Sequence, residues 1–110
     1  MEIEVWRSKL VEEQRALLVA SDGSSDSRAP VILDQQSVGR LSRMDAMQQQ
    51  AMAQASERRR QLRLERIKAA LKRIEDGAFG FCVECEEAIA LPRLESDPTT
   101  PTCIRCAAAR

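Results

Sequence analysis

The chain has 110 residues, and its 17 basic and 17 acidic side chains cancel to a formal net charge of zero. This length suits one domain, and a neutral chain is not a general electrostatic binder of nucleic acid. Aromatic residues are only 3% of the chain and histidine is absent. These features argue against a large globular core and remove the commonest general base of enzymes, so we expect a helical protein that is not an enzyme.

The first 20 residues have the apolar spacing of an amphipathic helix. Apolar side chains recur at intervals of three, four and seven, which places them on one face. The small polar residues that follow compete with a helix for backbone hydrogen bonds, and Pro30 bars one from continuing. We therefore predict a mobile connection near residues 21–37. The apolar face consists of Ile3, Trp6, Leu10 and Leu17, widened by Val11 and Leu18.

A second, longer helix is predicted to begin near residues 34–42 and to end near Asp76. No Gly or Pro interrupts residues 41–76, and Gly77 follows as a helix stop. Its apolar residues alternate by three and four, as in a coiled coil, and the pattern weakens toward the start. We predict an antiparallel helical hairpin that packs more tightly near the cysteines. The strong part of this seam is Leu64, Ile67, Leu71, Ile74 and Ala78, and the weak part is Leu41, Met44, Ala51, Ala55 and Leu62.

Residues 57–75 of this helix carry eight basic and three acidic residues, a net charge of plus five. One reading is a solvated face with ion pairs inside the helix. The other is a contact with an anionic partner, for which Arg59, Arg63 and Arg66 are the candidates.

All four cysteines lie near the C-terminus, as Cys82-x-x-Cys85, seventeen intervening residues, and Cys103-x-x-Cys106. Two such pairs at this separation are typical of a four-cysteine zinc site. Two turns each aim two sulfur atoms at one point, which completes a tetrahedron with Zn–S distances near ~2.3 Å. Four sulfur ligands leave no position for a reactive water. We therefore predict one structural Zn²⁺ and no catalytic residue.

Other cysteine chemistries fit less well. Disulfides need an oxidising compartment, and no secretory signal precedes the cysteines. A redox dithiol would stand as one pair near a βαβ pattern, and iron–sulfur spacings are more clustered. No apolar run approaches the ~20 residues of a membrane span, so we expect a cytoplasmic protein. One detail is unusual: Glu86 stands where zinc knuckles often have Gly, and a left-handed backbone there would cost about 1 kcal/mol.

The cysteine region resembles the DksA/TraR zinc-finger family of bacterial transcription regulators, as a short subgroup. The resemblance lies in Glu75-Asp76-Gly77-Ala78-Phe79-Gly80-Phe81-Cys82-Val83-Glu84-Cys85, then Ile89, Pro92-Arg93-Leu94-Glu95, Pro98-Thr99 and Cys103-Ile104-Arg105-Cys106. It implies a protein that binds RNA polymerase directly through a helical hairpin in the enzyme's secondary channel. Acidic residues at the hairpin tip act near the catalytic centre, and some members respond to guanosine tetraphosphate.

The resemblance transfers unevenly to single residues. The four cysteines carry over as metal ligands. The family's tip motif has two Asp three residues apart and then Ala, whereas this chain has only Asp45-Ala46, with Ser42 in the earlier position. We take Asp45 and Ala46 as the tip. Asp97 stands before Pro98 where alarmone-binding members carry a basic residue, which argues against tight alarmone binding.

The expected architecture is a hairpin over residues 1–78 followed by a C4 zinc-finger domain over residues 79–110, in a monomer. Its expected function is regulation of transcription through RNA polymerase, without direct DNA binding. An alternative is a nucleic-acid-binding zinc ribbon that uses the basic helix 58–73, although the acidic finger and few aromatics argue against it. A third is a thiol sensor that releases zinc on oxidation.

Overall fold

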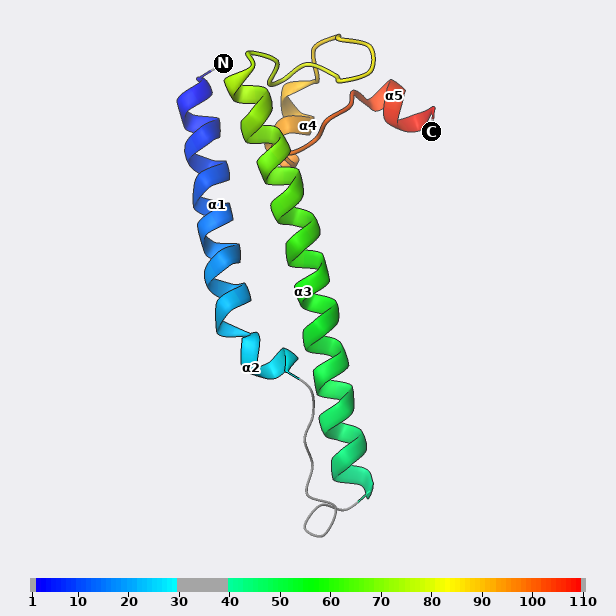
Figure 1. The fold of residues 1–110 in the computed structure, drawn as a ribbon. Coiled ribbons are helices and arrows are strands. Elements are labelled where there is room, and N and C mark those ends of the chain that lie inside the picture. Colours follow the sequence, from blue (N-terminus) through cyan, green and yellow to red (C-terminus); the bar gives the residue numbers. More distant parts are fainter. Residues whose placement is uncertain (1, 30–39, 110) are drawn as a thin grey trace. The chain divides into compact units, whose positions relative to one another are not determined.

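The computed structural model describes residues 2–29 and 40–109 (Figure 1). Long helices dominate it, which confirms the predicted mainly α fold with a cysteine-rich C-terminal domain. The sole β pairing within the described residues is one antiparallel bridge between Phe81 and Ala88. The helices are α1 (Ile3–Gly23), α2 (Ser25–Arg28), α3 (Arg40–Glu75), α4 (Leu91–Ser96) and α5 (Ile104–Ala108).

The chain divides into two compact units. The first unit contains Met1–Gln14 and Leu64–Arg110, and the second contains Arg15–Arg63. Both α1 and α3 contribute residues to each unit. The predicted boundary at residue 78 follows a different criterion, the start of the finger sequence, and it stays a prediction.

The predicted connection near residues 21–37 is wrong where the structure describes it. α1 continues to Gly23, and Ser25–Arg28 forms α2. The serine side chains support helical turns here, because the Ser24 hydroxyl donates to the Ser21 carbonyl at 3.0 Å and accepts from Arg28 Nε at 3.0 Å. Residues 30–37 of the predicted connection lie outside the described residues.

The long helix agrees closely with its prediction. α3 begins at Arg40, inside the predicted window, and ends at Glu75. Gly77 has φ +74°, and the bonds Gly77 N–H to Ile74 O (3.2 Å) and Ala78 N–H to Arg73 O (2.8 Å) form a Schellman motif. The predicted glycine stop is confirmed.

The first unit has an apolar core. Trp6 and Leu10 of α1 and Ile67 and Ile74 of α3 are buried, as the predicted seams require. Trp6 also lies 5.8 Å from the Phe79 ring, centroid to centroid, at a tilt of 49°. Ala70 is fully buried although no predicted seam contained it, while Leu64 and Leu71 are half-buried and Ala78 is exposed.

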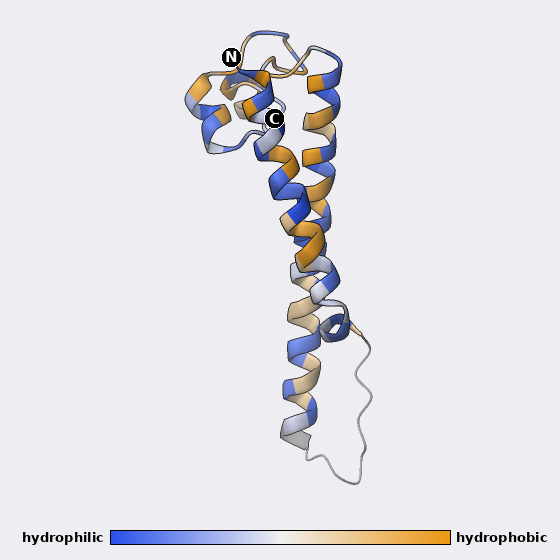
Figure 2. Cartoon of the chain, turned by 90° about the vertical axis from the view of Figure 1, so that its left-hand side faces the viewer, coloured by the Kyte–Doolittle hydropathy of each residue, from blue (hydrophilic) through white to orange (hydrophobic). Residues whose placement is uncertain are grey.

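The second unit has no buried hydrophobic side chain among its described residues. Met44 and Leu62, from the weak part of the predicted seam, are 57% and 60% exposed, which agrees with the looser packing predicted toward the start of α3. Leu18, Met47 and Met52 are exposed as well. In Figure 2 the N-terminal part of α3 is coloured pale or blue, so it contains few strongly hydrophobic residues.

No helix within residues 2–29 or 40–109 combines the length and apolar character that crossing a membrane requires.

Candidate metal centre

The four cysteines come together at one point. Their sulfur atoms all lie within 4.8 Å of one another, and Cys85 Sγ lies 3.7 Å from Cys103 Sγ. A zinc tetrahedron with Zn–S bonds of ~2.3 Å has sulfur–sulfur edges of about 3.8 Å. The donor set and its spacing therefore fit one Zn²⁺ ion.

The first pair sits on a tight turn closed by backbone hydrogen bonds. Glu86 N–H donates to Cys82 O at 2.9 Å, and Cys82 N–H donates to Glu87 O at 2.8 Å. Glu86 has φ +66°, the left-handed conformation that glycine adopts more easily. The expected strain at Glu86 is therefore present, and the turn keeps the geometry of a zinc knuckle.

The second pair sits at the start of a short helix. Cys103 is the N-cap of α5, with extended backbone angles, and Cys106 lies within the helix. Ala107 N–H donates to Cys103 O at 3.0 Å, which closes the turn that brings the two sulfurs together. Val83 N–H donates to Pro101 O at 2.9 Å and ties the first turn to the segment that enters the second.

A buried apolar patch and an arginine support these turns. Leu94 of α4 and Ile89 are buried, and Phe79 is buried against Trp6. Arg93 Nε donates to Thr102 O at 3.0 Å, directly before Cys103. Phe81 is 49% exposed and lines an apolar cavity of about 310 Å³ with Ile3, Ile74 and Ile89.

Without a metal ion, the four thiols do not ionise equally. Burial raises the pKa of the Cys82 thiol, but hydrogen bonds from the backbone of Cys85 and Cys103 and from the side chains of Cys85 and Cys106 together outweigh it and lower that pKa to about 6. Hydrogen bonding with Cys103, and then with Cys82 and Cys85, raises the pKa of the Cys106 thiol to about 12. Four thiolates at this distance repel one another, and a bound dication removes the conflict.

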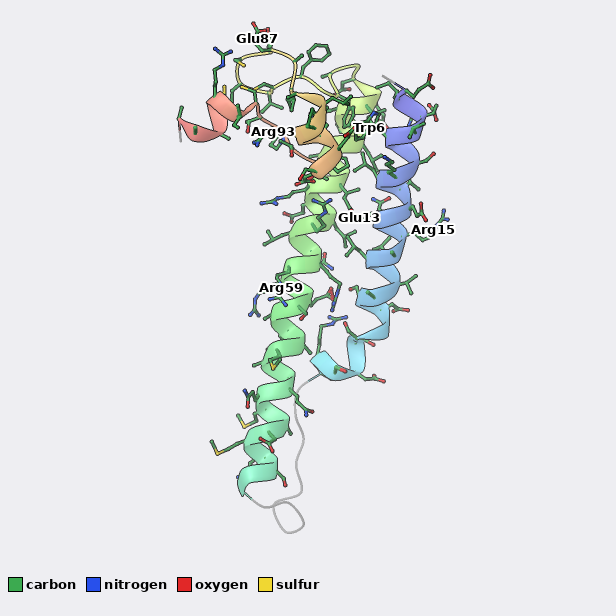
Figure 3. All side chains as sticks on the ribbon, turned by 180° about the vertical axis from the view of Figure 1, so that it is seen from behind. Trp6, Glu13, Arg15, Arg59, Glu87 and Arg93 are labelled. Carbon is green, nitrogen blue, oxygen red and sulfur yellow. The ribbon has the colours of Figure 1, made fainter. Side chains whose placement is uncertain are left out.

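The proposed tip residues lie far from the cysteines in the chain, on α3. Asp45 is exposed and Ala46 is half-buried, both near the start of the helix. The three basic candidates lie further along α3 at spacings of four and three residues, which share a helix face. Arg59 and Arg66 are exposed and Arg63 is half-buried. Figure 3 shows Arg59 on the side of α3 that faces away from α1.

Asp97 has a structural role that its sequence position did not reveal. Its carboxylate accepts from Thr99 N–H at 3.0 Å and from the Thr99 hydroxyl at 2.8 Å. It thereby stabilises the turn before Pro101, and one of its oxygen atoms is engaged in these two hydrogen bonds.

One group of residues, centred on Glu57 in the second unit, was not identified from the sequence. Glu57 is only 9% exposed, and it contacts Ser21, Arg28 and Arg60. Its spacing to Arg60 was a visible signal for an ion pair within the helix. Its partners Ser21 and Arg28 are 36 and 29 residues away, and local spacing contains no signal for them.

Comparison with known proteins agrees with this geometry. The family described as the prokaryotic dksA/traR C4-type zinc finger matches residues 77–110. The RNA polymerase-binding transcription factors DksA of Escherichia coli (strain K12) and of Salmonella typhimurium are each 30% identical over 106 residues, which is 94% of this chain. DksA of Caulobacter vibrioides is 27% identical over 94 residues, or 86% of the chain. The chain spans 63% of the first two relatives and 60% of the third.

A solved structure shares the fold. The transcription factor DksA2 from Pseudomonas aeruginosa matches 97% of this chain and 81% of its own, with a TM-score of 0.78 and 23% sequence identity. The C4 type requires four cysteine ligands, and the cysteine cluster supplies them around one structural zinc ion. Residues 77–110 thus match the prokaryotic dksA/traR C4-type zinc finger in sequence, and their four cysteines have the geometry that this type of finger requires.

Proposed function

We propose that this chain regulates transcription by binding RNA polymerase directly, with its paired helices inserted into the secondary channel. One observation carries the proposal. The similarity to proteins named RNA polymerase-binding transcription factor DksA extends over 94% of this chain, so it includes both long helices as well as the finger. Because the chain spans 63% of those relatives, the shared partner is inferred from the shared part alone.

In this proposal Cys82, Cys85, Cys103 and Cys106 bind the zinc ion, and the ion has a structural role. Four sulfur atoms complete its coordination, so no site is left for a water nucleophile or a substrate. The chain also contains no histidine to act as a general base. The protein then acts as a regulator that changes the polymerase by contact, not as an enzyme.

Asp45 is the residue proposed to act at the polymerase centre, with Ala46 beside it. Its carboxylate is exposed near the start of α3, as a contact residue requires. A monomer in the cytoplasm is the form that this mode of action needs, because a single hairpin enters the channel.

The basic face of α3 supports a second contact of the same complex. Arg59 and Arg66 are exposed, and they suit an acidic protein surface. The finger itself is a poor match for DNA, because its exposed acidic side chains would repel a phosphate backbone. They are Glu84, Glu86, Glu87 and Glu95.

The experiment is a binding and promoter-complex assay with purified core polymerase and holoenzyme. We expect the wild type to bind the polymerase and to change the lifetime of open promoter complexes. Asp45→Asn should bind comparably and lose most of the effect on lifetime. Asp22→Asn, which removes an exposed carboxylate from α1, is the matched control and should behave as wild type. No binding by the wild type would refute the proposal, and a full effect from Asp45→Asn would refute the tip assignment.

A DNA-binding measurement separates the alternative of a nucleic-acid-binding ribbon. Phosphate contacts weaken linearly on a log–log plot as salt rises, with a slope of about −0.9 for each phosphate neutralised on duplex DNA. We expect no such binding by the wild type at moderate salt. Steeply salt-dependent binding that Arg59→Ala and Arg66→Ala reduce would favour the alternative.

A further inference from the structure

A cluster of polar side chains joins α1 and α2 to α3 in the second unit. Its centre is the Glu57 carboxylate, which is largely shielded from solvent. One carboxylate oxygen accepts from the Ser21 hydroxyl at 2.6 Å and lies 3.2 Å from Arg28 Nε. The other accepts from Arg60 Nε at 3.4 Å and from Gln61 Nε2 at 3.3 Å.

The two arginines of this cluster share a second acceptor. The Ser24 hydroxyl oxygen accepts from Arg28 Nε at 3.0 Å and from Arg60 Nη2 at 2.8 Å. Arg28 Nη2 also donates to the Ser21 carbonyl at 2.8 Å. Arg28 is therefore held by both flanking helices, and the Glu57 carboxylate contacts both guanidinium groups.

The described contacts between α2 and the part of α3 that carries Asp45 lie next to this cluster. No residue from 42 to 56 is buried. The contacts of this segment with α2 are polar and weakly shielded: Gln50 Nε2 donates to Ala29 O at 2.8 Å, and Gln54 Nε2 donates to Arg28 O at 3.4 Å. Both acceptors are backbone carbonyls at the end of α2, so these bonds form only when α2 is in place.

This segment lacks a buried apolar face, although most helical stability in proteins comes from packing. No residue from 42 to 56 is buried, so its hydrogen bonds to α2 matter for keeping the segment ordered. The Ser21 hydroxyl in particular, and then Gln61 and the two arginines, keep the pKa of the Glu57 carboxyl below its usual range despite burial. The carboxylate is therefore charged at neutral pH.

We propose that Glu57 is a positioning residue: through Arg28 and Arg60 it holds α2 against α3 and so keeps the N-terminal part of α3, with Asp45, in an ordered helix. The first part, that Glu57 keeps this helix segment ordered, concerns the protein alone. The second part rests on the proposed function, because Asp45 can act at the polymerase only if the helix that carries it is formed.

Amide hydrogen exchange on the zinc-loaded protein tests the first part. In Glu57→Gln, which keeps the side chain's size and removes its charge, amides of residues 42–56 and 24–29 should exchange about tenfold faster or more, because charge-assisted hydrogen bonds are lost. Amides near Ile67 and Ile74 should be unchanged. Glu65→Gln, an exposed carboxylate on the same helix, is the matched control and should change neither set.

Two exchange results would overturn the inference. Unchanged exchange in residues 42–56 would mean that Glu57 does not hold this segment. Equal acceleration throughout α3 would mean that the substitution destabilises the whole fold and has no local positioning effect.

A double-mutant comparison identifies the partner. If Glu57 acts through Arg28, then Arg28→Ala alone should accelerate exchange in the same segment, and Arg28→Ala with Glu57→Gln should be no worse than the stronger single change. Additive effects would show that the two residues act independently and would overturn the proposed coupling.

The polymerase assay tests the second part. Glu57→Gln should retain most of its binding to the polymerase, because the basic face and finger are intact, and should lose most of its effect on promoter-complex lifetime. A full effect with the segment opened would overturn the link to Asp45. If the wild type fails to bind polymerase, the proposed function is wrong, and the exchange pattern still decides the role of Glu57.

Discussion

The two units of this chain are stabilised by different kinds of interaction. In the first, Trp6, Leu10, Ile67 and Ile74 exclude water around an apolar core, and a metal site secures the finger beside it. In the second, the central buried residue is a carboxylate, Glu57, surrounded by arginines and serines. Apolar contacts are non-directional and have no charge for salt to screen, whereas charged hydrogen bonds depend on pH, salt screening and geometry. The same two helices therefore gain stability from two sources that can be varied separately.

Zinc removal should have the largest effect, and it should be confined to the first unit at the outset. Structural zinc contributes on the order of 10–16 kcal/mol of apparent folding free energy in small zinc fingers. A chelator, or Cys82→Ser, should release Phe79 from Trp6, the one tryptophan in the chain. We expect a red shift of tryptophan fluorescence with chelator, reversed by zinc.

Magnesium in place of zinc is the control for this titration, because Mg²⁺ prefers oxygen ligands and should not restore the signal. A chelated protein that keeps its fluorescence and its secondary structure would show that the metal does not hold the finger.

A core substitution should have the next largest effect. Ile67 is fully buried, so Ile67→Ala should cost about 2–5 kcal/mol in the free energy of unfolding. Leu62→Ala on the same helix removes an exposed side chain and should change it by less than about 0.5 kcal/mol. Urea unfolding at saturating zinc measures both. Equal losses would contradict the division between a packed and an unpacked part of α3.

Acid should weaken the second unit through Glu57, with a smaller effect than the core substitution. The folded state lowers the pKa of this carboxyl below its ordinary value of 4.5. Its contribution is therefore complete above that value and is lost as the pH falls through the lowered pKa. The difference in helicity between wild type and Glu57→Gln should stay constant above this ordinary value of 4.5 and shrink as the pH falls below it.

The paired design removes the effect of zinc release, which acid causes equally in both proteins. Salt provides a second test at neutral pH, because the screening length falls from about 10 Å at 0.1 M to about 3 Å at 1 M. Exchange in residues 42–56 should rise with salt in the wild type and remain flat in Glu57→Gln. A pH-independent difference would show that the charge of Glu57 is not what holds the segment.

The smallest expected effect is at Glu86, in the zinc turn. Its φ of +66° costs an L-residue about 1 kcal/mol, so Glu86→Gly should raise the stability of the finger by up to that amount. Competition with a chromophoric zinc chelator measures the change in affinity. Glu87→Gly, one residue later and outside the left-handed region, should lower stability or leave it unchanged. A gain at Glu87 equal to that at Glu86 would show that backbone strain is not the cause.

Local chemistry made most of the first unit predictable from sequence. The cysteine spacing, the glycine at position 77 and the apolar seam each report a local geometric requirement. The structure agrees with the first two, and with the seam at Ile67 and Ile74. The second unit was less predictable. The spacing placed Met44 and Leu62 in the weak part of the seam, but it did not show that both would be exposed, because a weak apolar pattern does not specify how deeply a residue packs.

The Glu57 cluster was not predictable, because it joins residues that only the folded chain brings together. In the sequence, Glu57 is one acidic residue in a basic run, and Arg28 belongs to the segment that was predicted to be a polar connection. Ser21 and Ser24 were expected to end a helix, yet their hydroxyls bind charged side chains across the helix pair. The sequence shows that these side chains can form hydrogen bonds, but it does not show which distant residues they bind.

The exposed methionines of α3 have a consequence for chemical damage. Met44, Met47 and Met52 are each more than half exposed, and none contributes to a core. Oxidants convert a thioether to a polar sulfoxide, which unfolds a protein when the sulfur is buried. On this helix the same reaction would alter the surface without opening the interior, so peroxide would be consumed at a place where its product is harmless to the fold and reductases can reach it.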